Sequence, residues 1–236
     1  MNFNRLIFIA LLLALAACDG LPGKPNPADR YVRPTEVKDF DKLYAMNCSG
    51  CHGTNGRLGP AVPIGDPIYL ALAQPAHIES ITRDGVNGTT MPAFAIEAGG
   101  TLTDEQIAII AKGLAKKWGG DPPASMIANA PPLPVQQANS AGNPDRGAKT
   151  FKQFCGSCHG AEGRGAKTAG SVVEPPYLGL VSNQNLRTNT IVGRRDLGMP
   201  DWREVGDRPM TDQEVTDVVA WLAAQRPPSP SRIVAN

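Results

Sequence analysis

The chain has 236 residues, which is enough for one large or two small domains. Its 23 basic and 22 acidic residues nearly balance, so the composition gives no support to nucleic acid or another polyanion as a partner. Only 6% of the residues are aromatic, which is little for two protein cores. Small domains often need a metal or cofactor to be stable, and a bound group in each half would supply the missing apolar bulk.

The first residues predict an export signal. The apolar run at residues 6–17 follows Arg5 and, at twelve residues, is too short to span a membrane, but it suits the h-region of a signal peptide. Its end, Leu15-Ala16-Ala17-Cys18, resembles the lipobox of bacterial lipoproteins. This resemblance implies that residues 1–17 are removed and that Cys18 is acylated, which would give a stable membrane anchor. The alternative is an ordinary signal peptide with small residues at its cleavage site.

Two segments predict connections rather than domains. Residues 18–35 contain four prolines and two glycines without an apolar period, so they are expected to form a semi-extended tether. Such a tether could hold a domain up to roughly 50 Å from the lipid surface. Residues 121–143, rich in proline, alanine and asparagine, predict an interdomain linker, and residues 227–236 a short polar tail.

The first domain is predicted to cover residues 36–120 and contains the motif Cys48-Ser-Gly-Cys51-His52. CxxCH is the attachment pattern of c-type haem. Cys48 and Cys51 would each form a thioether to one porphyrin, and His52 would be the proximal ligand of the iron. Apolar residues at helical spacing predict a short helix that leads into this motif: Val37, Phe40, Leu43 and Tyr44.

The second domain, predicted at residues 144–226, repeats this plan with Cys155-Gly-Ser-Cys158-His159. Cys155 and Cys158 would attach a second haem, and His159 would bind its iron. Each domain also predicts a C-terminal helix that begins at a threonine cap, Thr103 in the first and Thr211 in the second. Gly119 and Gly120 are expected to end the first of these helices, and Pro227 and Pro228 the second.

The two domains match at a nearly constant offset, as a duplication would. The haem motifs lie 107 residues apart, and after one inserted residue the offset of 108 relates Met91-Pro92 to Met199-Pro200 and Thr103 to Thr211. One haem-binding domain therefore looks duplicated, and the sequence predicts two covalently bound haem c groups, each with its iron.

The repeat also predicts the second axial ligands. Met91 lies 39 residues after His52 and Met199 lies 40 after His159, and each stands in Met-Pro followed two residues later by an aromatic, Phe94 or Trp202. A thioether sulfur on the distal side of haem favours the reduced state. A single methionine is more often a core filler, but two at matched positions favour axial ligation.

Other candidate ligands have less support. Met46 is too close to Cys48 to reach across a haem, and Met126 lies in the predicted linker. Met210 precedes a predicted helix cap, where an apolar side chain is expected to pack. His77 has no histidine partner in the second repeat, so we interpret it as a surface or helix-start residue rather than an alternative ligand.

These motifs, over roughly residues 36–226, resemble two class I cytochrome c domains in tandem, as in the dihaem cytochromes c of bacterial respiratory chains. Examples are cytochrome c4 and the cytochrome subunits of membrane redox complexes. The resemblance implies an all-α fold in which C-terminal helices pack across N-terminal ones. Gly147 suits such a close crossing, whereas the first domain is expected to place Phe40 one residue from the equivalent position.

The resemblance also implies that a proline carbonyl after each motif orients the proximal histidine. Several prolines compete for this role, and the sequence does not choose among them: Pro60, Pro63 and Pro67 in the first domain, and Pro175 and Pro176 in the second.

The predicted ligation favours an electron carrier over an enzyme, because iron with two protein ligands has no position for a substrate. The alternatives are a haem-carrying subunit of a membrane dehydrogenase, quinol oxidoreductase or terminal oxidase, and a dihaem peroxidase. A peroxidase predicts an unpaired methionine, which the matched pair opposes. A dihaem thiosulfate dehydrogenase would need a cysteine ligand, and none is left once Cys18 is acylated.

The expected location is the outer, periplasmic side of a membrane, held by acylated Cys18. The expected partners are the lipid membrane and a membrane redox complex or other periplasmic carriers, in a respiratory or photosynthetic chain. Asp19 resembles a signal that keeps some lipoproteins on the inner membrane, although this rule varies between organisms.

Overall fold

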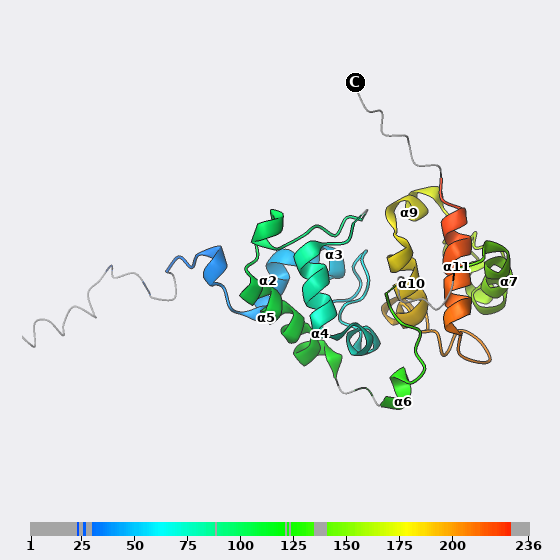
Figure 1. The fold of residues 1–236 in the computed structure, drawn as a ribbon, viewed down its shortest axis with the longest axis horizontal. Helices are drawn as coiled ribbons and strands as arrows, with labels where there is room; N and C mark the ends of the chain where they lie inside the picture. Colours follow the sequence, from blue (N-terminus) through cyan, green and yellow to red (C-terminus); the bar gives the residue numbers. More distant parts are fainter. Residues whose placement is uncertain are drawn as a thin grey trace, which may run out of the picture. The chain divides into compact units, whose positions relative to one another are not determined.

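The computed structural model describes residues 23, 26, 30–87, 89–120, 122, 124–134 and 141–227. Within these residues the regular structure is helical, with isolated β-bridges in place of strands, so the predicted all-α fold is confirmed (Figure 1). The predicted signal peptide and Cys18 lie outside the described residues, as does much of the predicted tether. No helix of this described part is both long and apolar enough to cross a bilayer.

The chain divides into two compact units, Met1–Val37 and Lys38–Asn236. The described part of the first unit contains one 3-10 turn, η3 (Pro34–Glu36), in which the Glu36 carboxylate accepts hydrogen bonds from the Arg33 main-chain N–H at 3.2 Å and from Arg33 Nε at 3.0 Å. Both haem motifs belong to the second unit. Its helices follow in chain order: α2 (Phe40–Asn47), α3 (Ser49–His52), α4 (Pro67–Asp84), η4 (Ile96–Ala98), α5 (Asp104–Leu114), the π-helical η5 (Ala115–Gly119), α6 (Ala124–Ile127), α7 (Pro144–Phe154), α8 (Gly156–His159), α9 (Pro175–Leu180), α10 (Asn183–Val192), η7 (Arg195–Leu197) and α11 (Asp212–Ala224).

The C-terminal helix of each repeat begins where the sequence predicts. Thr103 Oγ1 accepts a hydrogen bond from Gln106 N at 3.3 Å, and Gln106 Oε1 accepts one from Thr103 N at 3.0 Å, so α5 starts with a capping box. Thr211 and Glu214 form the same box at the start of α11. The helical region after α5 continues through η5 and ends at Gly120 with φ 59°, which confirms the predicted glycine stop.

The C-terminal helix of each repeat packs across the N-terminal one, as expected; Figure 1 shows α11 beside α7. A Cβ on Gly147 would lie 2.0 Å from the Asp217 carbonyl oxygen and 2.7 Å from Trp221 Cβ, so α7 needs a glycine there. In the first repeat the glycine is on the opposite helix, because a Cβ on Gly113 would lie 2.1 Å from the Phe40 ring.

The repeat offsets relate these two crossings directly. Phe40 aligns with Gly147 itself, so the expectation of a one-residue displacement was wrong, and Gly113 aligns with Trp221. Each crossing therefore pairs one glycine with one large aromatic residue, but the two residue types have exchanged helices.

A tryptophan completes each crossing from a different position. The Trp118 ring lies 4.9 Å from the Tyr44 ring, and the Trp221 ring lies 4.4 Å from the Phe151 ring, between centroids. The two repeats thus build an aromatic cluster at the same place with tryptophans from non-aligned positions.

Helix α4 corresponds to two helices of the second repeat. Its regular geometry breaks at Gln74, whose φ is 52°, directly before Pro75. At the aligned position Ser182 separates α9 from α10, and its hydroxyl accepts a hydrogen bond from Asn185 N at 3.1 Å. Proline lacks the N–H that a continuous helix would need, so the break follows from the sequence.

Part of the predicted linker packs against the second repeat. Leu133 is buried, and its carbonyl accepts a hydrogen bond from Gln184 at 2.8 Å. The fully buried Arg187 donates to the Pro132 carbonyl at 2.8 Å and pairs with Asp212 at the start of α11. Buried hydrogen bonds to a guanidinium fix this segment on α10 and α11.

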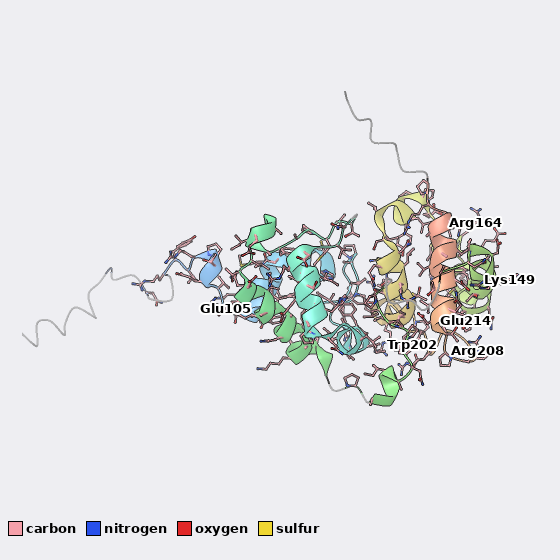
Figure 2. The ribbon with its side chains drawn as sticks, viewed as in Figure 1. Glu105, Lys149, Arg164, Trp202, Arg208 and Glu214 are labelled. Atoms are coloured by element: carbon pink, nitrogen blue, oxygen red, sulfur yellow. The ribbon has the colours of Figure 1, made fainter. Side chains whose placement is uncertain are left out.

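The cap of α11 predicts acid sensitivity. Arg208 binds the Glu214 carboxylate at 2.6 and 2.9 Å, and with the Thr211 N–H it lowers the pKa of Glu214 from 4.5 to about 2 (Figure 2). The depressed pKa means that this contribution to stability is present above about pH 4.5 and is lost as the pH falls towards 2. We expect Glu214→Gln to lower the melting temperature at pH 7 by a few degrees. Between pH 4.5 and 2, the melting temperature of this variant should decrease less than that of the wild type.

Thermal melts at closely spaced pH values test this expectation. Glu162→Gln is the matched control, because Glu162 and its partner Arg164 are both largely exposed and such pairs contribute little. Equal pH profiles for Glu214→Gln and the wild type would contradict the assigned role of Glu214.

Candidate functional site

The two haem motifs fold in the same way. Each lies on one short helical turn, α3 or α8, in which the histidine N–H donates to the carbonyl of the first cysteine, at 3.0 Å for His52 and 2.9 Å for His159. Residues three apart on a helix share a face, so the two cysteines of each motif are on one side. A glycine with positive φ, Gly53 or Gly160, ends each turn.

The surroundings of the first cysteine in each motif favour the protonated thiol. Burial, and then the charge of the second cysteine, raises the pKa of Cys48 to about 12, and the pKa of Cys155 is raised to about 12 in the same way. Metal-binding or nucleophilic cysteines need the thiolate form, which these surroundings disfavour. A thioether has no proton to lose, so it fits this environment.

Each motif histidine is held by one backbone carbonyl. His52 Nδ1 lies 2.9 Å from the Val62 carbonyl oxygen, and His159 Nδ1 lies 2.9 Å from that of Gly170. Burial lowers the pKa of His52, which favours the neutral ring. A neutral imidazole that donates from Nδ1 keeps the lone pair of Nε2 for a metal, so both histidines fit an axial role toward haem iron.

The expected proline carbonyls are not the acceptors. Val62 precedes Pro63, whereas Gly170 has no adjacent proline, so none of the five candidate prolines has this role. Sequence reasoning missed both acceptors because any residue supplies a carbonyl. Only the path of the loop decides which one reaches the ring.

The two candidate methionines occupy matching loops. Met91 follows α4 and its C-terminal Gly85, and the Met91 carbonyl accepts from Val86 N at 3.0 Å. Met199 follows α10, and its carbonyl accepts from Arg194 N, also at 3.0 Å. Val86 and Arg194 are aligned, so both methionines close equivalent loops. Their role as iron ligands stays a prediction.

The aromatic residues after the two methionines also accept equivalent main-chain hydrogen bonds. The Phe94 carbonyl accepts from Leu102 N and the Trp202 carbonyl from Met210 N, both at 2.8 Å. Trp202 is fully buried, with the Arg203 guanidinium 5.2 Å from its ring. The buried Met210 occupies the expected apolar position before the cap of α11.

The remaining candidates do not join these sites. Met46 is largely exposed on α2, and His77 lies in the second half of α4, where burial lowers its pKa. Among the residues that the structure describes, no group of three or more His, Cys, Asp or Glu side chains is placed to hold a metal ion.

Comparisons with known proteins show the family of the chain. A family model described as cytochrome C oxidase, cbb3-type, subunit III matches residues 35–112 and again residues 142–222, which is more than half of the chain. The chain is also similar to proteins named cytochrome bc1 complex cytochrome c subunit. The protein from Mycobacterium leprae is 22% identical over 91% of this chain and 72% of its own length, and that from Mycobacterium bovis is 22% identical over 91% and 74%.

Among solved structures, a chain of a reducing HAO-like protein complex from Kuenenia stuttgartiensis aligns over 84% of this chain and 100% of its own length. The TM-score is 0.41 and the sequence identity 16%. The family match covers both haem motifs. The chain therefore belongs to the family of the cbb3-type cytochrome c oxidase subunit III and is a c-type cytochrome, an electron-transfer protein with covalently bound haem c.

Proposed function

We propose that this protein is a dihaem cytochrome c with two closed redox centres. Cys48 and Cys51 would hold one haem and Cys155 and Cys158 the other. His52 and Met91 would be the axial ligands of the first centre, and His159 and Met199 those of the second. The observation that carries this proposal is the hydrogen bond that the two motif histidines share, since the Nδ1 atom of each lies 2.9 Å from a backbone carbonyl oxygen.

The protein's own residues would attach and tune the cofactor, which supplies reversible one-electron transfer when it is bound. Val62 and Gly170 orient the imidazoles, and the methionine sulfurs would raise the potential of the bound haem. If a histidine and a methionine bind each iron, no position on the iron would be left for a substrate or for peroxide. The proposed role is therefore electron transfer without bond chemistry at this chain.

The haem count tests the dihaem proposal. We expect mass spectrometry of the mature protein, made in cells that attach haem c, to give a mass increase equal to two haems. Replacing Cys155 and Cys158 by alanine should leave one haem, on the first motif, because each pair of cysteines serves one group. A wild-type protein with one haem would contradict the proposal.

The partner is proposed to be a quinol-oxidising membrane complex. The relatives named as bc1 complex cytochrome c subunits match across 91% of this chain, so the likeness includes both repeats together. This coverage favours a fixed subunit over a free shuttle. An oxidase is the second candidate, because the family is described by its oxidase subunit. Acylated Cys18 would hold the protein on the periplasmic side of the membrane, at the inner membrane if the Asp19 signal applies.

Membrane preparations test the partner and the anchor together. In mild detergent, the wild type should co-elute with integral membrane chains that oxidise quinol. Cys18→Ser protein should be washed from membranes by salt that leaves the wild type bound, since it keeps protein contacts but has lost its acyl chains. Elution of the wild type as an isolated monomer would contradict the subunit role, and salt-resistant Cys18→Ser protein would contradict the lipid anchor.

A further inference from the structure

The loop before Met199 reaches the first repeat. The Leu58 main-chain N–H donates a hydrogen bond to Asp196 Oδ2 at 2.8 Å, and Arg194 Nη2 donates one to the Gly59 carbonyl at 3.1 Å. Leu58 and Gly59 stand in the loop that follows the first haem motif, more than 130 residues earlier in the chain. We call Arg194 and Asp196, with the Leu58 and Gly59 groups that they bind, the inter-repeat clamp.

The neighbouring Arg195 adds a third contact. Its guanidinium lies 3.4 Å from the Asp66 carboxylate, which accepts from Ile68 N at 2.8 Å and so caps α4. Arg195 also lies 3.8 Å from Asp201 in its own repeat. Three consecutive residues of the second repeat thus contact one region of the first.

The two charged groups of the clamp form a largely buried ion pair rather than an exposed surface pair. Arg194 binds Asp196 through Nε at 3.0 Å and Nη2 at 2.9 Å, and the exposed fractions of the two side chains are 14% and 3%. These bonds from Arg194 hold the pKa of Asp196 below its ordinary value, so the carboxylate is charged at neutral pH. Removing either partner would leave a largely buried charge unpaired.

On the second-repeat side, the clamp is joined directly to Met199. Arg194 and Met199 exchange two main-chain hydrogen bonds, each 3.0 Å long. The aligned loop of the first repeat is closed locally instead, because the Thr89 hydroxyl accepts from Met91 N at 3.1 Å and donates to the Val86 carbonyl at 2.7 Å. Among the described residues of the two loops, it is thus the second loop in which the residue bonded to the methionine main chain, Arg194, also binds the other repeat through its side chain.

In the first repeat, the clamp residue Gly59 packs directly against the main chain of Cys51 and His52. A Cβ on Gly59 would lie 2.3 Å from the Cys51 carbonyl oxygen and 2.6 Å from the His52 carbonyl carbon. The carbonyl that Arg194 binds thus belongs to a residue packed tightly on the first haem motif.

Leu58 shows that this loop is held in a costly conformation. Its φ is 62°, in the left-handed region, and the aligned residue of the second repeat is Gly165 with φ 95°. A leucine there is strained where glycine is not, and surrounding contacts must maintain it. The Asp196 carboxylate, which binds the Leu58 N–H, is such a contact.

We propose that Arg194 and Asp196 are positioning residues for Met199, and that through them the first repeat holds the axial-methionine loop of the second centre. This inference rests on the proposed ligand role of Met199. Coupling of this kind is reciprocal, so the clamp also holds the loop behind His52.

The test uses the full-length holoprotein with Asp196→Ala, and with Asp196→Asn in case the first variant folds poorly. Amide exchange at Leu58, followed by NMR of the reduced protein, should become roughly tenfold faster in Asp196→Ala, since a hydrogen bond to a charged group is lost. The reduction potential of the second centre should fall and its methionine-ligand absorption band should weaken, while the first centre keeps its band. The second centre is identified as the one altered by Met199→Ala.

Arg203→Gln is the matched control. It breaks an ion pair to Asp201 at 2.7 Å, close to Met199, but the hydrogen bonds that Arg203 donates to Asp201 lie within the second repeat. It should leave the Leu58 exchange rate unchanged. An unchanged Leu58 rate in both Asp196 variants would overturn the clamp whatever the haem ligands are. Faster Leu58 exchange with an unchanged second centre would overturn the positioning role, and a wild type without methionine ligation would overturn the ligand assignment instead.

Discussion

Met199→Ala is expected to convert one of the two haems to high spin and to lower its reduction potential, while the other haem keeps the wild-type spectrum. If Met199 is the proposed ligand, its thioether sulfur would stabilise the reduced iron, so its loss would favour the oxidised state. Axial ligands set haem potentials over a range of roughly 0.8 V, so this is the largest functional change that a single substitution here should produce. Absorption spectra and a potentiometric titration measure both effects.

Met91→Ala should convert the other haem to high spin and lower its reduction potential, since Met91 and Met199 close equivalent loops. Two other methionines serve as controls. Met46→Ala should change neither haem, because Met46 is 67% exposed, and Met210→Ala should lower stability without changing ligation, because Met210 is 3% exposed and precedes a cap. If the spectrum of Met91→Ala or of Met199→Ala matches the wild type, that ligand assignment is wrong.

Gly147→Ala is expected to destabilise the second repeat by roughly 3 kcal/mol or more. The added Cβ would overlap the Asp217 carbonyl at 2.0 Å, and this atom belongs to the backbone of α11, which cannot move aside as a flexible side chain can. The two helices would have to separate along the whole crossing. Denaturant unfolding of the holoprotein, followed by far-UV circular dichroism and haem absorbance, measures the loss.

Gly179→Ala is the matched control for that substitution. Gly179 lies in α9 with no atom within 4 Å of an added Cβ, so alanine should change the free energy of unfolding by at most about 1 kcal/mol, in the stabilising direction. Equal stability of the two variants would show that the α7–α11 crossing is looser than the structure describes.

Local features of the fold follow from the sequence because each depends on a few adjacent residues. The capping boxes at Thr103 and Thr211 and the glycine stop at Gly120 belong to this class. The break at Gln74 also has a local cause, since Pro75 stands directly after it. The haem motifs are equally local, so haem attachment is the part of the function that the sequence predicts most directly.

Features that depend on the path of a loop could not be predicted. The acceptors for the two histidines are the carbonyls of Val62 and Gly170, which leave no mark on the sequence. The contact of Asp196 with Leu58 joins residues 138 apart, and an Arg-Arg-Asp tripeptide by itself indicates only a polar loop. A leucine with positive φ is likewise unexpected from its residue type.

The exchange of glycine and aromatic residue between the two crossings bears on how the chain folds. Duplicated domains risk pairing the first helix of one copy with the last helix of the other. Here such mispairing would set Phe40 against Trp221, two rings in a space that fits one, and Gly147 against Gly113, with a void between them. Correct pairing of α2 with α5 and of α7 with α11 avoids both penalties, so the exchange selects against misassembly of the two copies.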